Sequence, residues 1–218
     1  AAAVSKNIPL YQNIGNYKTL PLPLMNIING GSHANNSLRI QEFMIRPNKA
    51  KNFKDAINIC FLVIQKLRFL ISSRKLSTNL GDEGGFAPSL SNNEEAIELI
   101  LKAIEDAGYK AGTDISVCLD VAANELYKEE KYAVNSSKFI SANETIKYYL
   151  NLIKKYSIKS IEDPFFEDDW DARPVESQFL LQQDMSLLIL DHFLLFLYLS
   201  ELESSSGYCR RSLAPQQG

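Results

Sequence analysis

The spacing of hydrophobic residues predicts strands and helices in alternation through the middle of the chain. Short apolar runs bounded by turn residues predict strands at 25–28, 38–45, 115–122 and 158–161, with a small hairpin at 127–134. Apolar residues at helical spacing predict helices over 53–71, 96–104 and 146–153. Strand, helix and strand in alternation are typical of an α/β fold with a largely parallel sheet.

Two of the predicted helices are preceded by a capping box. Ser91 with Glu94, and Ser141 with Glu144, place a hydroxyl and a carboxylate three residues apart before an apolar face. Gly108 suits the position just after the second helix, where a left-handed backbone is common. These signals predict where the helices begin and end.

The overall composition excludes few classes of protein but favours a soluble domain. Of the 218 residues, 45% are hydrophobic and 22% are charged. The net charge of -3 gives no reason to expect nucleic acid or an anionic membrane as a partner. The apolar stretch 187–199 is shorter than the roughly 20 residues that a membrane span needs, and it contains Asp191 and His192. We therefore expect no membrane span.

The three cysteines show no metal-ligand spacing. Cys60 and Cys118 lie in apolar periodic segments, and Cys209 lies far from both. An odd number of cysteines in such positions indicates buried, reduced thiols of a cytoplasmic protein.

Three segments carry residues with candidate chemistry on or beside turns. Gly81–Gly85 holds Glu83 among three glycines, where a carboxylate can act as a general acid, although a solvated surface turn is an open alternative. His33 follows a glycine pair, a position where many histidines are simply solvated. Glu42 follows Gln41 inside an apolar strand, where a charge is costly unless it is paired or faces a polar cavity.

Asp120 and Glu162 lie at the ends of two predicted buried strands. In α/β sheets and barrels, ligands bind at the carboxyl ends of the strands. Carboxylate oxygens suit Mg²⁺. Helix capping and salt bridges remain the alternatives for each acid alone, and the pair favours a metal site.

Taken together, these segments resemble the enolase family. The matching strings follow one another in the family's order: Leu22-Pro23-Leu24-Met25-Asn26-Ile27-Ile28-Asn29-Gly30-Gly31-Ser32-His33-Ala34, Gln41-Glu42-Phe43-Met44-Ile45, Gly81-Asp82-Glu83-Gly84-Gly85-Phe86-Ala87-Pro88, Leu119-Asp120, and Ser160-Ile161-Glu162-Asp163-Pro164-Phe165 with Asp168-Asp169-Trp170. The resemblance covers about residues 1–172.

The resemblance implies a partial β/α barrel of the enolase, TIM-like type. Residues 1–20 are expected to be the end of a small α+β N-terminal domain that is otherwise largely missing, and 21–172 the first half of the barrel domain. A complete barrel takes about 250 residues. Residues 173–218 are interpreted as a divergent tail, either frameshifted or disordered.

The resemblance also implies roles for matched residues. Glu83 and Glu42 correspond to the family's acid catalysts, with Glu42 acting through a shared water. Gln41 and His33 correspond to substrate contacts, His33 near the phosphate.

The same resemblance implies the cofactor and the reaction. Asp120 and Glu162 correspond to two of three protein ligands of Mg²⁺, and Glu42 and Glu162 also face the substrate. The reaction is the dehydration of 2-phosphoglycerate to phosphoenolpyruvate in glycolysis, by a cytoplasmic homodimer. The alternative is an inactive fragment that offers at most a binding surface, because the third metal carboxylate, the lysine base and a later His and Lys have no recognisable match. Asp191 matches the missing carboxylate only vaguely.

Overall fold

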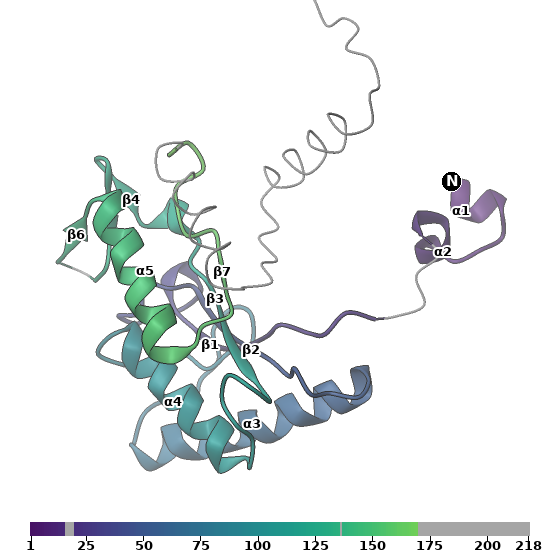
Figure 1. Cartoon of the computed structure of the whole chain (residues 1–218), viewed down its shortest axis with the longest axis horizontal. Coiled ribbons are helices and arrows are strands. Elements are labelled where there is room, and N and C mark those ends of the chain that lie inside the picture. The colour runs from purple at the N-terminus through teal and green to yellow at the C-terminus, as the bar shows by residue number, and fades with distance from the viewer. Residues whose placement is uncertain (16–19, 136, 170–218) are drawn as a thin grey trace, which may run out of the picture.

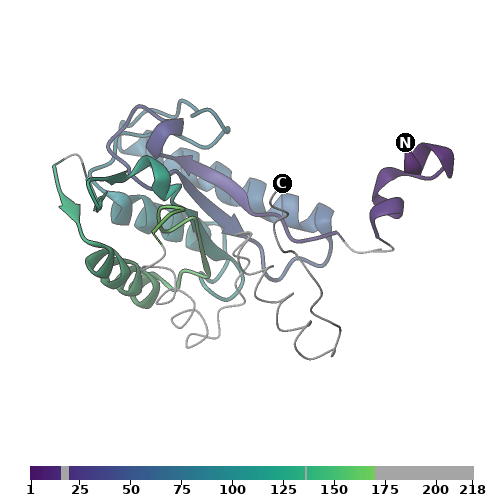
Figure 2. The same ribbon diagram turned by 90° about the horizontal axis from the view of Figure 1, so that it is seen from above.

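The computed structural model describes residues 1–15, 20–135 and 137–169. Two short helices, α1 (Ala2–Ser5) and α2 (Leu10–Ile14), precede the body of the chain and lie apart from it in both ribbon views (Figure 1, Figure 2). The expectation that residues 173–218 form a divergent tail concerns residues outside the described part of the chain.

A four-stranded sheet forms the centre of the body. Its strands, in spatial order, are β1 (Met25–Asn29), β2 (Glu42–Arg46), β3 (Ser116–Asp120) and β7 (Ser160–Glu162). The β1–β2 and β2–β3 pairs are antiparallel, and only the β3–β7 pair is parallel. Among the described residues the sheet stays open and does not close into a barrel.

The prediction of a largely parallel sheet is therefore wrong for the described strands. The connection from β1 to β2 contains a single turn of 3-10 helix, Gly31–His33, and no crossover helix. The connection from β2 to β3 contains two helices, which reverse the chain twice, so β3 returns antiparallel to β2. Only β3 and β7 are joined through one helix, the arrangement that makes neighbouring strands parallel.

Three helices supply most of the remaining core. They are α3 (Phe53–Ser73), α4 (Asn93–Asp106) and α5 (Ala142–Tyr156). Figure 1 shows α3 and α4 side by side along the sheet with α5 beside α4. Their apolar residues and the inward-facing residues of the strands form one hydrophobic cluster, which packs the helices against the sheet.

The helix starts follow the capping signals with one correction. Ser141 and Glu144 form the predicted capping box of α5. For α4 the capping residue is Asn92, one position later than predicted, and its side chain accepts from the Glu95 N–H at 2.8 Å. Asn caps as well as Ser. Gly108 follows α4 with φ +87°, as predicted.

The predicted hairpin is present and is part of a small second sheet. β4 (Tyr127–Lys128), β5 (Lys131–Ala133) and β6 (Phe139–Ile140) pair antiparallel in that order. The hydroxyl of Tyr132 donates to Asp169 Oδ2 at 2.6 Å and accepts from the Phe166 N–H at 3.1 Å. The hairpin thereby fixes the segment that follows β7.

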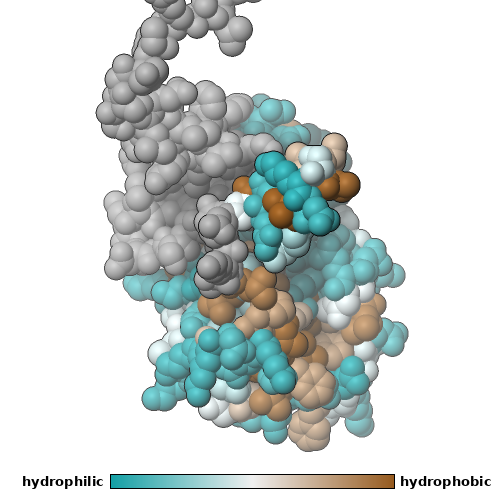
Figure 3. Space-filling model, turned by 90° about the vertical axis from the view of Figure 1, so that its right-hand side faces the viewer, coloured by the Kyte–Doolittle hydropathy of each residue, from teal (hydrophilic) through white to brown (hydrophobic). Residues whose placement is uncertain are grey.

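Several apolar side chains of α3 stay at the surface. Phe53, Ile57 and Phe61 recur every four residues and are exposed, while the opposite stripe of the helix is buried. The space-filling view shows hydrophobic surface gathered on the side of the molecule that it presents (Figure 3). By length and composition alone α3 would pass as a membrane span. Six residues of this helix are buried, and they belong to the hydrophobic core of the domain. The core helix of a domain commonly has this length and hydropathy.

Cys60 and Cys118 are buried and free, as predicted. Cys60 lies on α3 and Cys118 on β3, and both are fully enclosed. Cys209 lies outside the described residues.

Candidate active site

A row of polar residues crosses the sheet at one end of its strands. The strand register pairs Asn29 with Glu42, Glu42 with Asp120, and Asp120 with Glu162. Residues directly opposite each other on neighbouring strands project their side chains from the same face. Because β2 runs antiparallel, its first residue meets the last residue of β3. The fold thus brings three acids together from positions 42, 120 and 162.

Two loops approach the same edge and bring His33 and Glu83 together. The Asp82 N–H donates to the His33 carbonyl at 3.1 Å, which ties the second loop to the first. His33 Nδ1 lies 3.7 Å from Glu83 Oε2, and the Asn26 amide lies 3.5 Å from the same oxygen. Ligand atoms of His33, Glu42 and Glu83 all lie within 4.8 Å of one another.

Glu42 and Glu83 interact, and their pKa values are shifted in opposite directions. Burial, reinforced by the hydrogen bond and charge of Glu83 and by the charges of Asp120 and Glu162, raises the pKa of Glu42 to about 8. The hydrogen bond from Glu42, helped by His33, lowers the pKa of Glu83. Two neighbouring carboxyls whose pKa values move apart hold one proton between them near neutral pH.

Asp120 and Glu162 make no salt bridge to a lysine or arginine among the described residues. Burial, then the nearby charges of Asp163 and Glu83, raise the pKa of Asp120, and the Ala122 N–H offsets this by donating to Asp120 Oδ1 at 3.0 Å. Burial, then the charge of Asp120, raises the pKa of Glu162. Half-buried carboxylates without a lysine or arginine leave negative charge uncompensated. This donor set of hard oxygens fits a divalent cation such as Mg²⁺.

Comparison with known proteins identifies the family. The family model described as "Enolase, C-terminal TIM barrel domain" matches residues 17–190, well over half of the chain. This chain belongs to the enolase family. A curated protein named "Enolase" from Pelagibacter ubique (strain HTCC1062) is 61% identical over 174 residues, which is 78% of this chain and 41% of that relative. The chain therefore spans about two fifths of the length of the enolase it matches.

The remaining predicted residue of this enolase chain, Gln41, lies at the same edge of the sheet. Its N–H donates to the Asp120 carbonyl at 3.1 Å, and its carbonyl accepts from the Gly30 N–H at 2.9 Å. The backbone of Gln41 thus extends the ladder beyond β2, and the side chain is half-buried. All six site residues predicted from the enolase motifs converge on this edge, and their individual roles stay predictions.

Two asparagines at this candidate site were missed by sequence reasoning. Asn26 contacts Glu83, and Asn29 lies opposite Glu42. Both lie in the apolar run of β1, and asparagine is depleted in strands. An amide inside a strand was therefore the signal that could have identified them.

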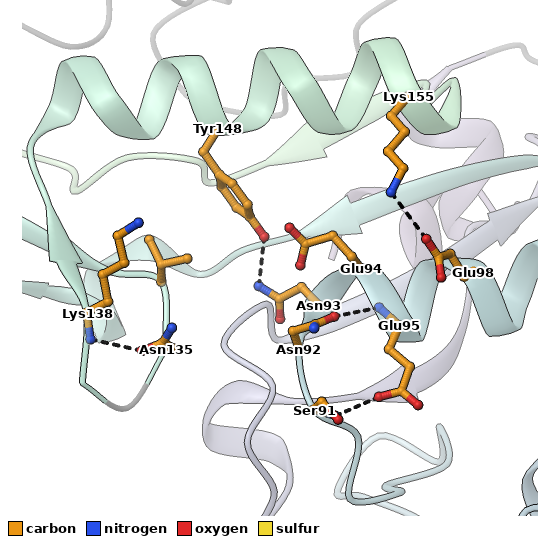
Figure 4. Close-up of a pocket in the computed structure, with 11 residues that line it drawn as sticks. Ser91, Asn92, Asn93, Glu94, Glu95, Glu98, Asn135, Lys138, Tyr148 and Lys155 are labelled. Atoms are coloured by element: carbon orange, nitrogen blue, oxygen red, sulfur yellow. Dashed lines mark hydrogen bonds and ion pairs between the residues drawn. The ribbon is translucent and has the colours of Figure 1, made fainter.

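A cleft elsewhere in the enolase chain holds none of the predicted residues. It measures about 610 Å³ and lies between the start of α4, the loop around residues 134–138 and α5 (Figure 4). Its polar groups bond to one another: the Asn93 amide donates to the Tyr148 hydroxyl at 3.3 Å, and Lys155 pairs with Glu98 at 3.3 Å. These contacts link α4 to α5. The residues that line the cleft do not include Glu42, Asp120 or Glu162.

Proposed function

We propose that this chain carries the acid side of an enolase active site, which dehydrates 2-phosphoglycerate to phosphoenolpyruvate with Mg²⁺. The observation that supports this most strongly is the convergence of Glu42, Asp120 and Glu162 at one end of the strands, with a carboxylate oxygen of Glu83 within 4.8 Å of one of Glu42. These residues lie far apart in the sequence, and the fold alone brings them together.

In this proposal Asp120 and Glu162 hold the metal ion. A bound Mg²⁺ supplies positive charge that stabilises the negative charge developing on the substrate carboxylate. The two carboxylates fix the position of that charge relative to the proton-sharing pair. Glu162 and Gln41, which lie at the same end of the strands, contact the substrate in this proposal.

Glu83 and Glu42 handle the leaving group. In dehydration the C–H bond beside the substrate carboxylate breaks, a C=C bond forms, and hydroxide leaves from the next carbon. The proton held between Glu83 and Glu42 passes to that oxygen, so that water departs. His33, beside Glu83, contacts the phosphate in this proposal. The C–H proton needs a base, which in the family is a lysine. Because residues 1–172 offer no match for it, turnover by this chain requires a base from residues 173–218 or from a partner chain.

The second candidate is a binding role without catalysis. The observation that favours it is that the carboxylates of Glu42, Asp120 and Glu162 lie side by side and offer metal ligands by themselves. In that case the acid row binds Mg²⁺ while the reaction is absent. For the catalytic proposal we expect a cytoplasmic, glycolytic homodimer.

An absorbance assay separates the two candidates. The purified chain is mixed with 2-phosphoglycerate and Mg²⁺, and the ultraviolet band of the enol product is followed, with EDTA as the control. Product that depends on the metal supports the catalytic proposal. Calorimetric titration of Mg²⁺ without product supports the binding role, and absence of both refutes each candidate.

A further inference from the structure

Asn29 is a fully buried amide without a side-chain partner. It ends β1 and is 0% exposed. Within the described residues, neither its Oδ1 nor its Nδ2 makes a hydrogen bond. The buried amide of Asn93 behaves differently, because it caps the backbone at Arg39 and donates to Tyr148. A buried amide is normally hydrogen-bonded, so Asn29 calls for an explanation.

The side chain of Asn29 lies beneath the loop that carries Glu83. A Cβ atom added to Gly81 would come within 2.7 Å of Asn29 Cβ, and one added to Gly85 within 2.4 Å of Asn29 Oδ1. The loop therefore rests directly on this side chain. The backbone adds a second link, since the Asn29 N–H donates to the Phe86 carbonyl at 2.9 Å.

One further unpaired polar atom lies at the same place. Asn26 Oδ1 is buried without a partner among the described residues and lies 3.1 Å from the Cβ position of Gly85. The amide nitrogen of Asn26 donates to Glu83 at 3.5 Å. Two amides that converge beneath one glycine provide the two to four polar partners that a buried water needs.

We propose that Asn29 is a positioning residue, whose amide, through one water shared with Asn26, holds the Gly81–Gly85 loop so that Glu83 stays beside Glu42. Asn29 itself touches no reacting atom. The contacts between Asn29 and the Gly81–Gly85 loop are enough to support its role in holding that loop. Its catalytic meaning rests on the roles proposed above for Glu83 and Glu42.

The decisive comparison is between Asn29→Thr and Asn29→Val. The two replacements have the same shape and both suit a strand, but only threonine keeps a hydrogen-bonding group. If Asn29 merely fills space, the two variants behave alike. If its polar group matters, only Val loosens the loop.

Amide hydrogen exchange measured by NMR reports the loop without substrate. The Gly81 N–H bonds to the Gly85 carbonyl and the Phe86 N–H bonds to the Ile27 carbonyl, so both amides report loop closure. We expect exchange at these amides about tenfold faster in Asn29→Val than in Asn29→Thr, which corresponds to loss of one net hydrogen bond. The carboxyl ¹³C resonance of Glu83 is expected to shift in the Val variant alone.

Thr145→Val is the matched control. Thr145 is 2% exposed on α5, and its hydroxyl donates to the Ser141 carbonyl at 2.9 Å. This change removes a buried hydroxyl far from the loop, so it lowers global stability without moving the Glu83 resonance. Equal loop exchange in the Thr and Val variants of Asn29 would overturn the proposal.

A measurement on the unmodified chain covers the case in which a variant fails to fold. A long-lived water is expected to give a nuclear Overhauser effect to the side-chain amide protons of Asn29. Its absence overturns the water-mediated link. None of these measurements uses 2-phosphoglycerate. A chain without activity would therefore refute the proposed reaction but would not bear on the role of Asn29 in holding the loop.

Discussion

Replacing Glu42 by Gln is expected to remove a pH-dependent loss of stability from the metal-free chain. Burial, followed by the hydrogen bond and charge of Glu83, raises the pKa of Glu42 from 4.5 to about 8. A carboxyl with a higher pKa in the folded than in the unfolded chain favours folding most at low pH. That contribution is complete below about pH 4.5 and is lost as the pH rises through about 8.

The size of the effect follows from the shift and from the exposure of the carboxyl. At about 1.4 kcal/mol per pKa unit, the full shift corresponds to roughly 5 kcal/mol for a carboxyl sealed from water. Glu42 is only half-buried, so solvent screening reduces the expected effect to about 1–2 kcal/mol. Gln keeps a donor for Glu83 and has no charge to lose, so the variant should gain this amount relative to the parent above about pH 8.

Urea unfolding followed by circular dichroism measures this difference. The free energy of unfolding is compared between parent and variant near pH 5 and near pH 9, with EDTA present. Glu105→Gln, which changes an exposed carboxyl of α4, is the control. If the parent and Glu42→Gln lose stability equally across this range, the reasoning about the shared proton is refuted.

Three further changes test the metal ligands, the acid and the hairpin. Asp120→Asn should weaken Mg²⁺ binding about tenfold or more, because one of the two proposed carboxylate ligands is lost. Calorimetry measures the affinity, and the control variant Glu98→Gln is expected to bind Mg²⁺ as the parent does. In a catalytically complete protein, Glu83→Gln should lower turnover by about 10² to 10⁴ with Mg²⁺ affinity unchanged, and normal turnover would reject Glu83 as the acid. Tyr132→Phe should cost about 1–3 kcal/mol of stability, because it removes the hydrogen bond to Asp169 and leaves that carboxylate with one donor fewer; thermal unfolding that matches the parent would contradict this.

Local signals in the sequence predicted local structure well. The α5 capping box, the Gly108 helix end and the hairpin around Tyr127 depend on residues a few positions apart, so pattern and structure agree. The start of α4 moved by one residue because Asn92 and Ser91 are equally good caps and both have a glutamate three residues later.

Strand direction and the asparagines required the three-dimensional structure. The alternation of strands and helices does not state how many helices separate two strands in space, and the pair α3–α4 makes β2 and β3 antiparallel. The role of Asn29 could not be predicted from neighbouring residues, because its side chain contacts Gly81 and Gly85, more than 50 residues later in the sequence. Five of the six site residues were candidates from their local setting alone: Glu83, His33, Glu42, Asp120 and Glu162. The enolase resemblance added Gln41 and gave each residue an expected role.

The order of the strands in the sheet has a consequence for synthesis on the ribosome. In the large sheet, β1, β2, β3 and β7 lie side by side in the same order in which they are translated. Each strand can therefore add to the growing edge as it emerges, and none must insert between two strands already paired. Carboxylates join the row in the same sequence, from Glu42 to Asp120 to Glu162. If this row binds Mg²⁺ as proposed, its ligands are complete only after β7 has left the exit tunnel, so affinity for the ion rises stepwise during translation.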